Sequence, residues 1–156
     1  MVRAVVGFIL GIILAFVVVI GAQALVNYVY PLPRGLNVFD RAAMEAVFRA
    51  MPASQFAMIL TTYFLGGLAG GFVATKVGNA YWPLWAVAII IALVAAMNVF
   101  TYPHPVWAQI GAIVGPLVGG WVAKRLAGPL RIAVPVEDDV VIADDNSIEN
   151  ARDGAV

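Results

Sequence analysis

Three long stretches of this sequence contain no Asp, Glu, Lys or Arg, and they constrain the fold more than any other feature. The stretches cover residues 4–33, 50–75 and 77–123. A membrane-spanning helix needs roughly 20 consecutive apolar residues, so the first two stretches hold one span each and the third, of 47 residues, holds two. The third stretch breaks at Tyr102-Pro103-His104-Pro105, because each proline removes a backbone donor and fixes φ. We predict four spans, at about residues 4–25, 56–75, 80–100 and 106–123.

The composition agrees with a membrane protein. Hydrophobic residues make up 63% of the chain and charged residues 12%, whereas charged residues account for about 25% of a soluble domain. The formal net charge is zero, which argues against nucleic acid as a partner, since that binding depends on basic patches. The chain has no cysteine, so disulfides and thiolate metal sites are excluded. The predicted fold class is an all-α membrane protein, a bundle of four transmembrane helices.

The first apolar stretch also has features of a secretory signal peptide. Arg3 precedes the apolar run, and Ala22-Gln23-Ala24 fits the pattern of a cleavage site. The apolar run from Val5 to Ile20 has 16 residues, slightly more than the roughly 7 to 15 of a typical signal core. We therefore expect the span to be retained.

An internal repeat supports this expectation. The segment "FLGGLAGGFVATK" at residues 64–76 aligns with "IVGPLVGGWVAKR" at residues 113–125, and "VYPLPRG" at residues 29–35 aligns with "TYPHPVW" at residues 101–107. Spans one and two then form a copy of spans three and four. Because each copy has two spans, both would cross the membrane in the same direction, as parallel helical hairpins. The alternative is that glycine-rich apolar helices resemble one another by composition alone.

The first copy contains an additional segment, "NVFDRAAMEAVFRAMP" at residues 37–52, which predicts a short amphipathic helix at about residues 38–51. Asn37 is the expected start and Pro52 the expected end. Met44, Val47 and Phe48 recur on one face at helical spacing. We expect this helix to lie on the outer membrane surface with its apolar face down, and a docking site for a partner is the alternative.

The distribution of basic residues predicts the orientation. Cytoplasmic segments of membrane proteins are enriched in Lys and Arg, which places both termini and Arg3, Lys76, Lys124, Arg125 and Arg131 in the cytoplasm. The Tyr-Pro-x-Pro segments then face outward, each as a helix stop with an aromatic anchor. Residues 1–127 form the transmembrane domain in this prediction. Residues 128–156 are rich in acids and form a flexible cytoplasmic tail, which could alternatively add a strand to a partner's sheet.

Uncharged polar residues gather in the predicted outer half of the spans and form a candidate polar cluster. Its members are Gln23, Asn27, Thr61, Thr62, Asn98, His104 and Gln109, with Tyr63 and Thr101 at the same level. Such side chains can hydrogen-bond between helices, so packing is one interpretation. The other is a shallow site, open to the outside, for a polar or lipid-like ligand.

Glycines spaced four apart gather in the predicted inner half, where missing side chains let helix backbones approach closely. The candidate packing residues are Gly66, Gly70, Gly71, Gly111, Gly115 and Gly119, and Gly7 and Gly11 repeat the pattern on the first span. The pattern leaves open whether these glycines join helices of one chain or of two.

No motif for catalysis, metal binding or cofactor binding is found. His104 is the only histidine, and no acid is near it in sequence. The predicted spans hold no ionisable Asp, Glu, Lys, Arg or His, although such residues usually mark proton pumps and transporters. We expect a protein that is not an enzyme and has no cofactor and no metal.

The segments "YPLPRG" at residues 30–35 and "PHPVW" at residues 103–107 resemble a family of small bacterial four-span inner-membrane proteins with no established activity. The resemblance covers Ala4 to about Leu126. It implies the four-span architecture, a bacterial source and a location in the plasma membrane. The first functional hypothesis is a non-enzymatic accessory or interaction protein, partnered by the lipid bilayer and by a second copy or a larger membrane complex. The alternative is a small transporter or exporter subunit that works as a dimer, with the polar cluster as its site.

Overall fold

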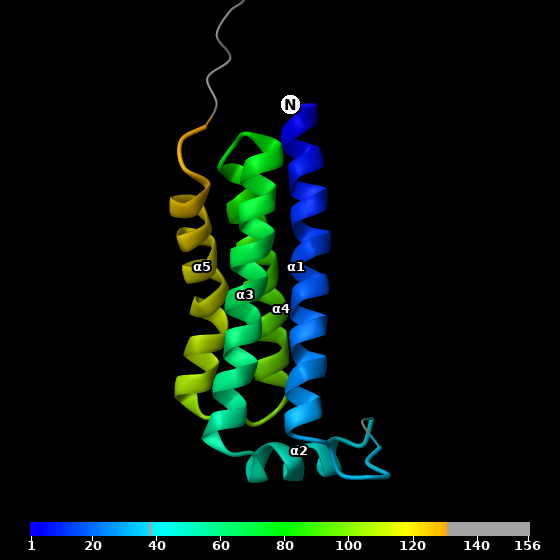
Figure 1. Cartoon of the computed structure of the whole chain (residues 1–156). Coiled ribbons are helices and arrows are strands. Elements are labelled where there is room, and N and C mark those ends of the chain that lie inside the picture. Colours follow the sequence, from blue (N-terminus) through cyan, green and yellow to red (C-terminus); the bar gives the residue numbers. More distant parts are fainter. Residues whose placement is uncertain (38, 131–156) are drawn as a thin grey trace, which may run out of the picture.

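The computed structural model describes residues 1–37 and 39–130 and contains five α-helices in this part of the chain. Four long helices run side by side: α1 (Val2–Val29), α3 (Ala53–Gly78), α4 (Trp82–Thr101) and α5 (Val106–Ala127). The short helix α2 (Arg41–Ala50) lies across one end of this bundle. Successive long helices run in opposite directions, so the amino terminus and the end of α5 lie together at the end opposite α2 (Figure 1).

The four long helices are each long and apolar enough to cross a membrane, which confirms the prediction of four apolar spans. At about 1.5 Å per residue, even the 20-residue helix α4 matches the roughly 30 Å of a hydrocarbon core. α1 and α3 are longer, with 28 and 26 residues. The described residues contain no β-strand, and the predicted tail lies outside the described residues from position 131 onward.

The Tyr-Pro-x-Pro segments end helices, as predicted. Tyr30 is the residue that follows α1, and Tyr102 is the residue that follows α4. Both segments lie at the α2 end of the bundle (Figure 1). The opposite connection, between α3 and α4, turns at Asn79 with φ of 49°, a left-handed conformation that asparagine tolerates better than most residues.

The helix α2 starts later than predicted. Asp40, not Asn37, caps it: one carboxylate oxygen accepts hydrogen bonds from the amides of Ala42 (3.0 Å) and Ala43 (3.2 Å). The Asn37 side chain instead accepts a hydrogen bond from the amide of Phe39 in the preceding turn. A cap that accepts from the second and third helical amides satisfies donors that have no partner inside the helix, so the helix begins at Arg41.

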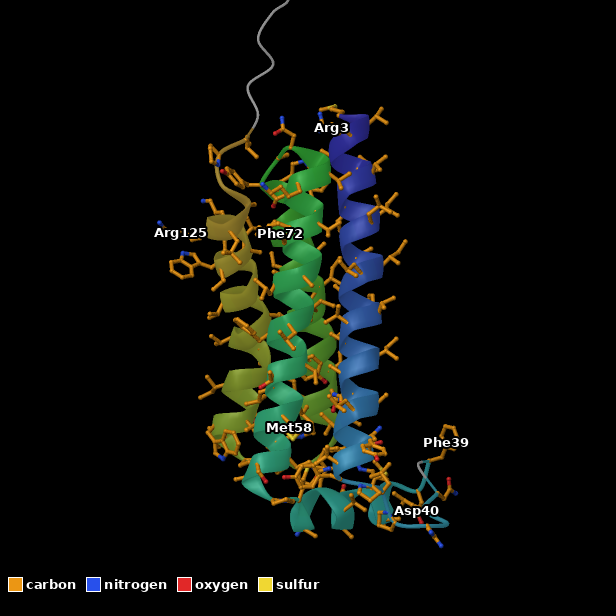
Figure 2. All side chains as sticks on the ribbon, in the orientation of Figure 1. Arg3, Phe39, Asp40, Met58, Phe72 and Arg125 are labelled. Carbon is orange, nitrogen blue, oxygen red and sulfur yellow. The ribbon has the colours of Figure 1, made fainter. Side chains whose placement is uncertain are left out.

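The apolar face of α2 is directed toward the end of the bundle, where Met44, Val47 and Phe48 line a cavity. The expected position of this helix on the outer membrane surface stays a prediction. The opposite face carries Arg41 and Glu45, which form an exposed ion pair at 3.0 Å. Side chains, and not close backbone packing, connect α2 to the long helices. Phe39 and Asp40 precede α2 and project away from the bundle (Figure 2).

Most glycines of the long helices face neighbouring helices of the same chain, and Gly21 is the exception. A Cβ atom added to Gly70 would lie 2.6 Å from the Cβ of Ala15 in α1, and one on Gly7 would lie 2.5 Å from the backbone nitrogen of Gly78. Among the predicted packing residues, Gly66 faces α1, Gly71 faces α4 and α5, and Gly111, Gly115 and Gly119 face α3. Gly67, which the glycine spacing in the sequence did not single out, lies against the backbone of Pro116.

The end of the bundle opposite α2 carries basic side chains that are held by carbonyl and aromatic groups. The Arg3 guanidinium donates a hydrogen bond to the Val77 carbonyl at 2.9 Å. Lys124 lies 4.9 Å from the ring centre of Tyr81, and Arg125 lies 5.1 Å from that of Trp121. Arg3 and Arg125 stand at this end in Figure 2. Cations over aromatic faces are stabilised by the ring quadrupole.

Candidate functional site

A cavity of about 500 Å³ lies beneath α2, at the end of the bundle where the Tyr-Pro-x-Pro segments are found. Residues of α1, α2, α3 and α4 line it, together with Leu32 and His104 from the middle of the two Tyr-Pro-x-Pro segments. This volume lies in the range of roughly 300 to 1,000 Å³ that is typical of small-molecule sites. The cavity is the candidate functional site of the described residues.

Six uncharged polar side chains contribute to the lining: Gln23, Asn27, Gln55, Tyr63, Asn98 and His104. They come from α1, α3, α4 and the loop before α5. The Tyr63 hydroxyl lies within hydrogen-bonding reach of the Asn98 side chain. The rest of the lining is apolar and includes no Asp, Glu, Lys or Arg.

The structure brings four of the seven residues of the candidate polar cluster to this cavity: Gln23, Asn27, Asn98 and His104. Thr61 and Thr62 line a different, smaller pocket between α1 and α3, and their hydroxyls donate to carbonyls of their own helix, those of Ala57 (2.9 Å) and Ile59 (2.8 Å). Serine and threonine commonly bond in this way within helices.

Gln109 also lies outside the cavity lining. Its amide nitrogen donates a hydrogen bond of 2.9 Å to the backbone carbonyl of His104. This bond fixes the loop between α4 and α5, so Gln109 positions a lining residue without lining the cavity.

Gln55 was missed because the second span was expected to begin at Phe56. In the structure α3 begins at Ala53, immediately after Pro52, so Gln55 lies in the first helical turn. Proline is favoured at the start of helices, and Pro52 was the sequence signal that could have placed Gln55 in the helix.

The Gln55 side chain is 8% exposed and makes no hydrogen bond to any described residue. Among the described residues, no side-chain nitrogen or oxygen is both fully sealed and without a partner. The Gln55 amide, which carries two donors and an acceptor, is therefore not fully sealed, and Gln55 lines both this cavity and a neighbouring one beside Val29 and Pro52. A buried amide that lacks a protein partner is available to a bound molecule.

The imidazole of His104 joins an aromatic cluster at the α2 end of the bundle. Phe48 of α2 stacks on Tyr102 with 4.8 Å between ring centres, and lies equally far from His104. Phe56 contacts the His104 ring at 5.4 Å. These contacts attach α2 to the first turn of α3 and to the loop that follows α4.

His104 bonds to the backbone of its own loop through its ring. Nδ1 lies 2.8 Å from the Tyr102 carbonyl oxygen, and because a carbonyl only accepts, Nδ1 donates. Among residues 1–37 and 39–130, no three His, Cys, Asp or Glu side chains gather where they could hold a metal ion.

Comparison of the chain with protein-family models, with curated proteins and with solved structures finds no match. The class that the fold defines is thus a helical protein with four candidate membrane-spanning helices. Within the described residues, the cavity beneath α2 combines a volume of about 500 Å³ with six uncharged polar side chains.

Proposed function

We propose that this chain is a non-enzymatic accessory protein of the bacterial plasma membrane that acts by binding a molecule in the cavity beneath α2. The observation that carries the proposal is the convergence of neutral amide, phenol and imidazole groups on one cavity, with the Gln55 amide accessible and without a protein partner. Neutral groups that both donate and accept hydrogen bonds suit reversible binding of an uncharged molecule.

The proposed orientation has both termini in the cytoplasm and α2 outside. Its support is the charge difference between the two ends. The end opposite α2 has Arg3, Lys76, Lys124 and Arg125 and no acid among the described residues, whereas at the α2 end Asp40 and Glu45 offset part of the charge of three arginines. Cytoplasmic loops carry the excess of Lys and Arg. A periplasmic reporter fused after Val156 should be inactive, and an active fusion would reverse the assignment.

The proposed internal repeat has support at the crossing of α3 and α5. Gly67 and Pro116, which the repeat alignment makes equivalent, lie against each other there. A Cβ on Gly71 would lie 3.6 Å from the Cα of its equivalent, Gly120. Residues near an axis that relates two copies meet their own equivalents, so an axis between the two hairpins would pass through this crossing.

Native mass spectrometry of the protein extracted in mild detergent tests the binding proposal. The chain should retain a small molecule that the Gln55→Leu, Asn98→Leu double variant loses. Thr61→Val is the matched control, because the Thr61 hydroxyl bonds only within α3, and it should retain the molecule. A native chain without a bound molecule, or equal retention by the double variant, would contradict the proposal.

The second candidate, a dimeric transporter or exporter subunit, is favoured by the exposure of Asn27 and Asn98 on apolar helices. Polar side chains in membrane helices usually find partners across a helix interface, which a second copy could supply. Substrate-dependent flux in reconstituted vesicles, abolished by Asn98→Leu, would favour the transporter over the accessory protein.

A further inference from the structure

From the shape and polarity of the cavity we infer that its ligand is an uncharged membrane amphiphile of the diacylglycerol class, which enters from the bilayer between α1 and α4. The inference rests on the proposed function and specifies the chemistry of the bound molecule. Three observations carry it: the lining includes exposed residues of α1 and α4, its polarity changes along these two helices, and it contains no Asp, Glu, Lys or Arg.

The sideways opening is defined by lining residues that are also exposed. On α4, Val94 is 38% exposed and lines the cavity, and on α1, Ile20 is 66% exposed and lines it too. Val94 lies seven residues before the end of α4, or about 10 Å at 1.5 Å per residue. The opening therefore extends along apolar, membrane-length helices, where acyl chains and not water would border it.

On α1 and α4 the lining changes from polar to apolar with distance from α2. Asn27 and Gln23 are near the end of α1, whereas Val19 and Phe16 lie deeper on the same face. From Asn27 to Phe16 the helix advances about 16 Å. Val94 continues the apolar part on α4, whereas on α3 the apolar Ile59 is followed one turn deeper by the phenol of Tyr63. A molecule with a hydrogen-bonding head beneath α2 and an apolar chain along α1 and α4 would match both parts.

The absence of ionised groups from the lining selects a neutral head. The charged residues of α2 are directed away from the cavity, and the Arg41 and Arg49 side chains are 79% and 75% exposed. A phosphate would find no Lys or Arg within the cavity, and burial of an unpaired charge is costly. Hydroxyl and ester groups could instead bond to the amides of Gln55, Gln23 and Asn98.

The flexible side chains of Met44 and Met51 form part of the cover over this head region. Methionine adapts to molecules of irregular shape. The Phe48 ring completes the cover, and its stacking on Tyr102 together with its tilted contact with His104 holds α2 in place above the cavity.

A photolabelling experiment tests the inference. The full-length protein is reconstituted in phosphatidylcholine vesicles that contain a trace of diacylglycerol with a photoactivatable group on one chain. Adducts should concentrate in peptides of α1 and α4, and excess unlabelled diacylglycerol should remove them. Loss of one amide hydrogen bond in Asn98→Leu should lower labelling about fivefold, and Gln23→Leu serves as a second variant if Asn98→Leu does not fold. Thr61→Val should label like the native chain.

Two results would overturn the inference. One is equal competition by phosphatidylglycerol, which would show that a charged head is accepted. The other is even labelling of all four long helices, which would indicate bulk lipid contact. The two proposals can fail separately. If the Gln55→Leu, Asn98→Leu variant loses a bound molecule in native mass spectrometry, the proposed function stands. If diacylglycerol labelling is nevertheless unspecific, the diacylglycerol class is the wrong ligand.

Discussion

The two ends of the α1–α3 pair are packed differently. Toward the amino terminus, Gly7 and Gly11 of α1 meet Gly78 and Ala74 of α3 so closely that an added Cβ would contact backbone atoms. Toward α2, the same two helices present Gln23, Asn27, Gln55 and Ile59 to a cavity. Residue size decides the difference, because small residues let backbones approach, whereas longer polar side chains keep the helices apart and leave volume. One end is closely packed and the other contains the cavity that we propose as a ligand site.

The largest expected effect comes from filling the close-packed end. In Gly70→Ala the new Cβ would lie 2.6 Å from both the Cβ of Ala15 and the Gly11 carbonyl oxygen, so α1 and α3 must separate. Overpacking of this kind typically costs about 1 to 3 kcal/mol. Thermal unfolding in detergent should show the loss of stability.

Gly21→Ala is the matched control for Gly70→Ala. It lies on the same helix pair, on α1, but a Cβ added at this position would meet no neighbouring atom within 4 Å. Alanine favours helix over glycine, so this variant should be as stable as the native chain or slightly more stable. Equal destabilisation by both variants would contradict the packing difference between the two ends.

The second effect concerns the attachment of α2. Phe48→Ala removes the ring contacts with Tyr102 and His104, each at 4.8 Å. Aromatic pairs contribute about 0.5 to 1.5 kcal/mol each beyond their buried area, so amide hydrogen exchange in α2 should accelerate at least fivefold. Exchange in the close-packed end should not change.

Phe39→Ala is the control for this exchange experiment, because Phe39 is 94% exposed. It should leave the exchange of α2 as it is in the native chain. If Phe48→Ala also left α2 protected, the aromatic cluster would not be what holds the helix.

A smaller effect should follow from Asp40→Ala, which deletes the cap of α2 and its two hydrogen bonds. Loss of an Asp cap costs about 1 kcal/mol, so exchange in the first turn of α2 should accelerate about fivefold. Asn37→Ala, which removes one hydrogen bond in the preceding turn, should affect this turn less. Faster exchange in Asn37→Ala than in Asp40→Ala would instead indicate that Asn37 is the start of the helix.

The sequence predicts the long helices well because their apolar length is a local property. Charge-free stretches located all four, although α1, α3 and α5 extend a few residues further than predicted. Local signals were less reliable at α2, where Asn37 and Asp40 are both good capping residues. Only the structure shows that Asp40 reaches the amides of the first helical turn.

The cavity could be predicted only in part, because it depends on tertiary placement. The sequence selects Gln23, Asn27 and Asn98 as polar residues in the outer half of the predicted spans. Thr61 is equally suitable by that criterion, and only the structure shows that it does not line the cavity and that its hydroxyl bonds within its own helix. Gln55 could be selected from the sequence only if the start of α3 was placed correctly, at Ala53. The position of α2 over the bundle depends on ring contacts between distant segments, which no local pattern reports.

The most direct test of a ligand cavity beneath α2 is an experimental structure of the full chain in lipid nanodiscs, at a resolution that shows side chains. We expect α2 across the end of the bundle, with elongated non-protein density between α1 and α4 whose head lies beside Gln55 and Asn98. A structure in which α2 lies flat on the lipid surface, away from the bundle, would contradict this arrangement. So would side chains that fill the space between Tyr63 and Phe48 completely.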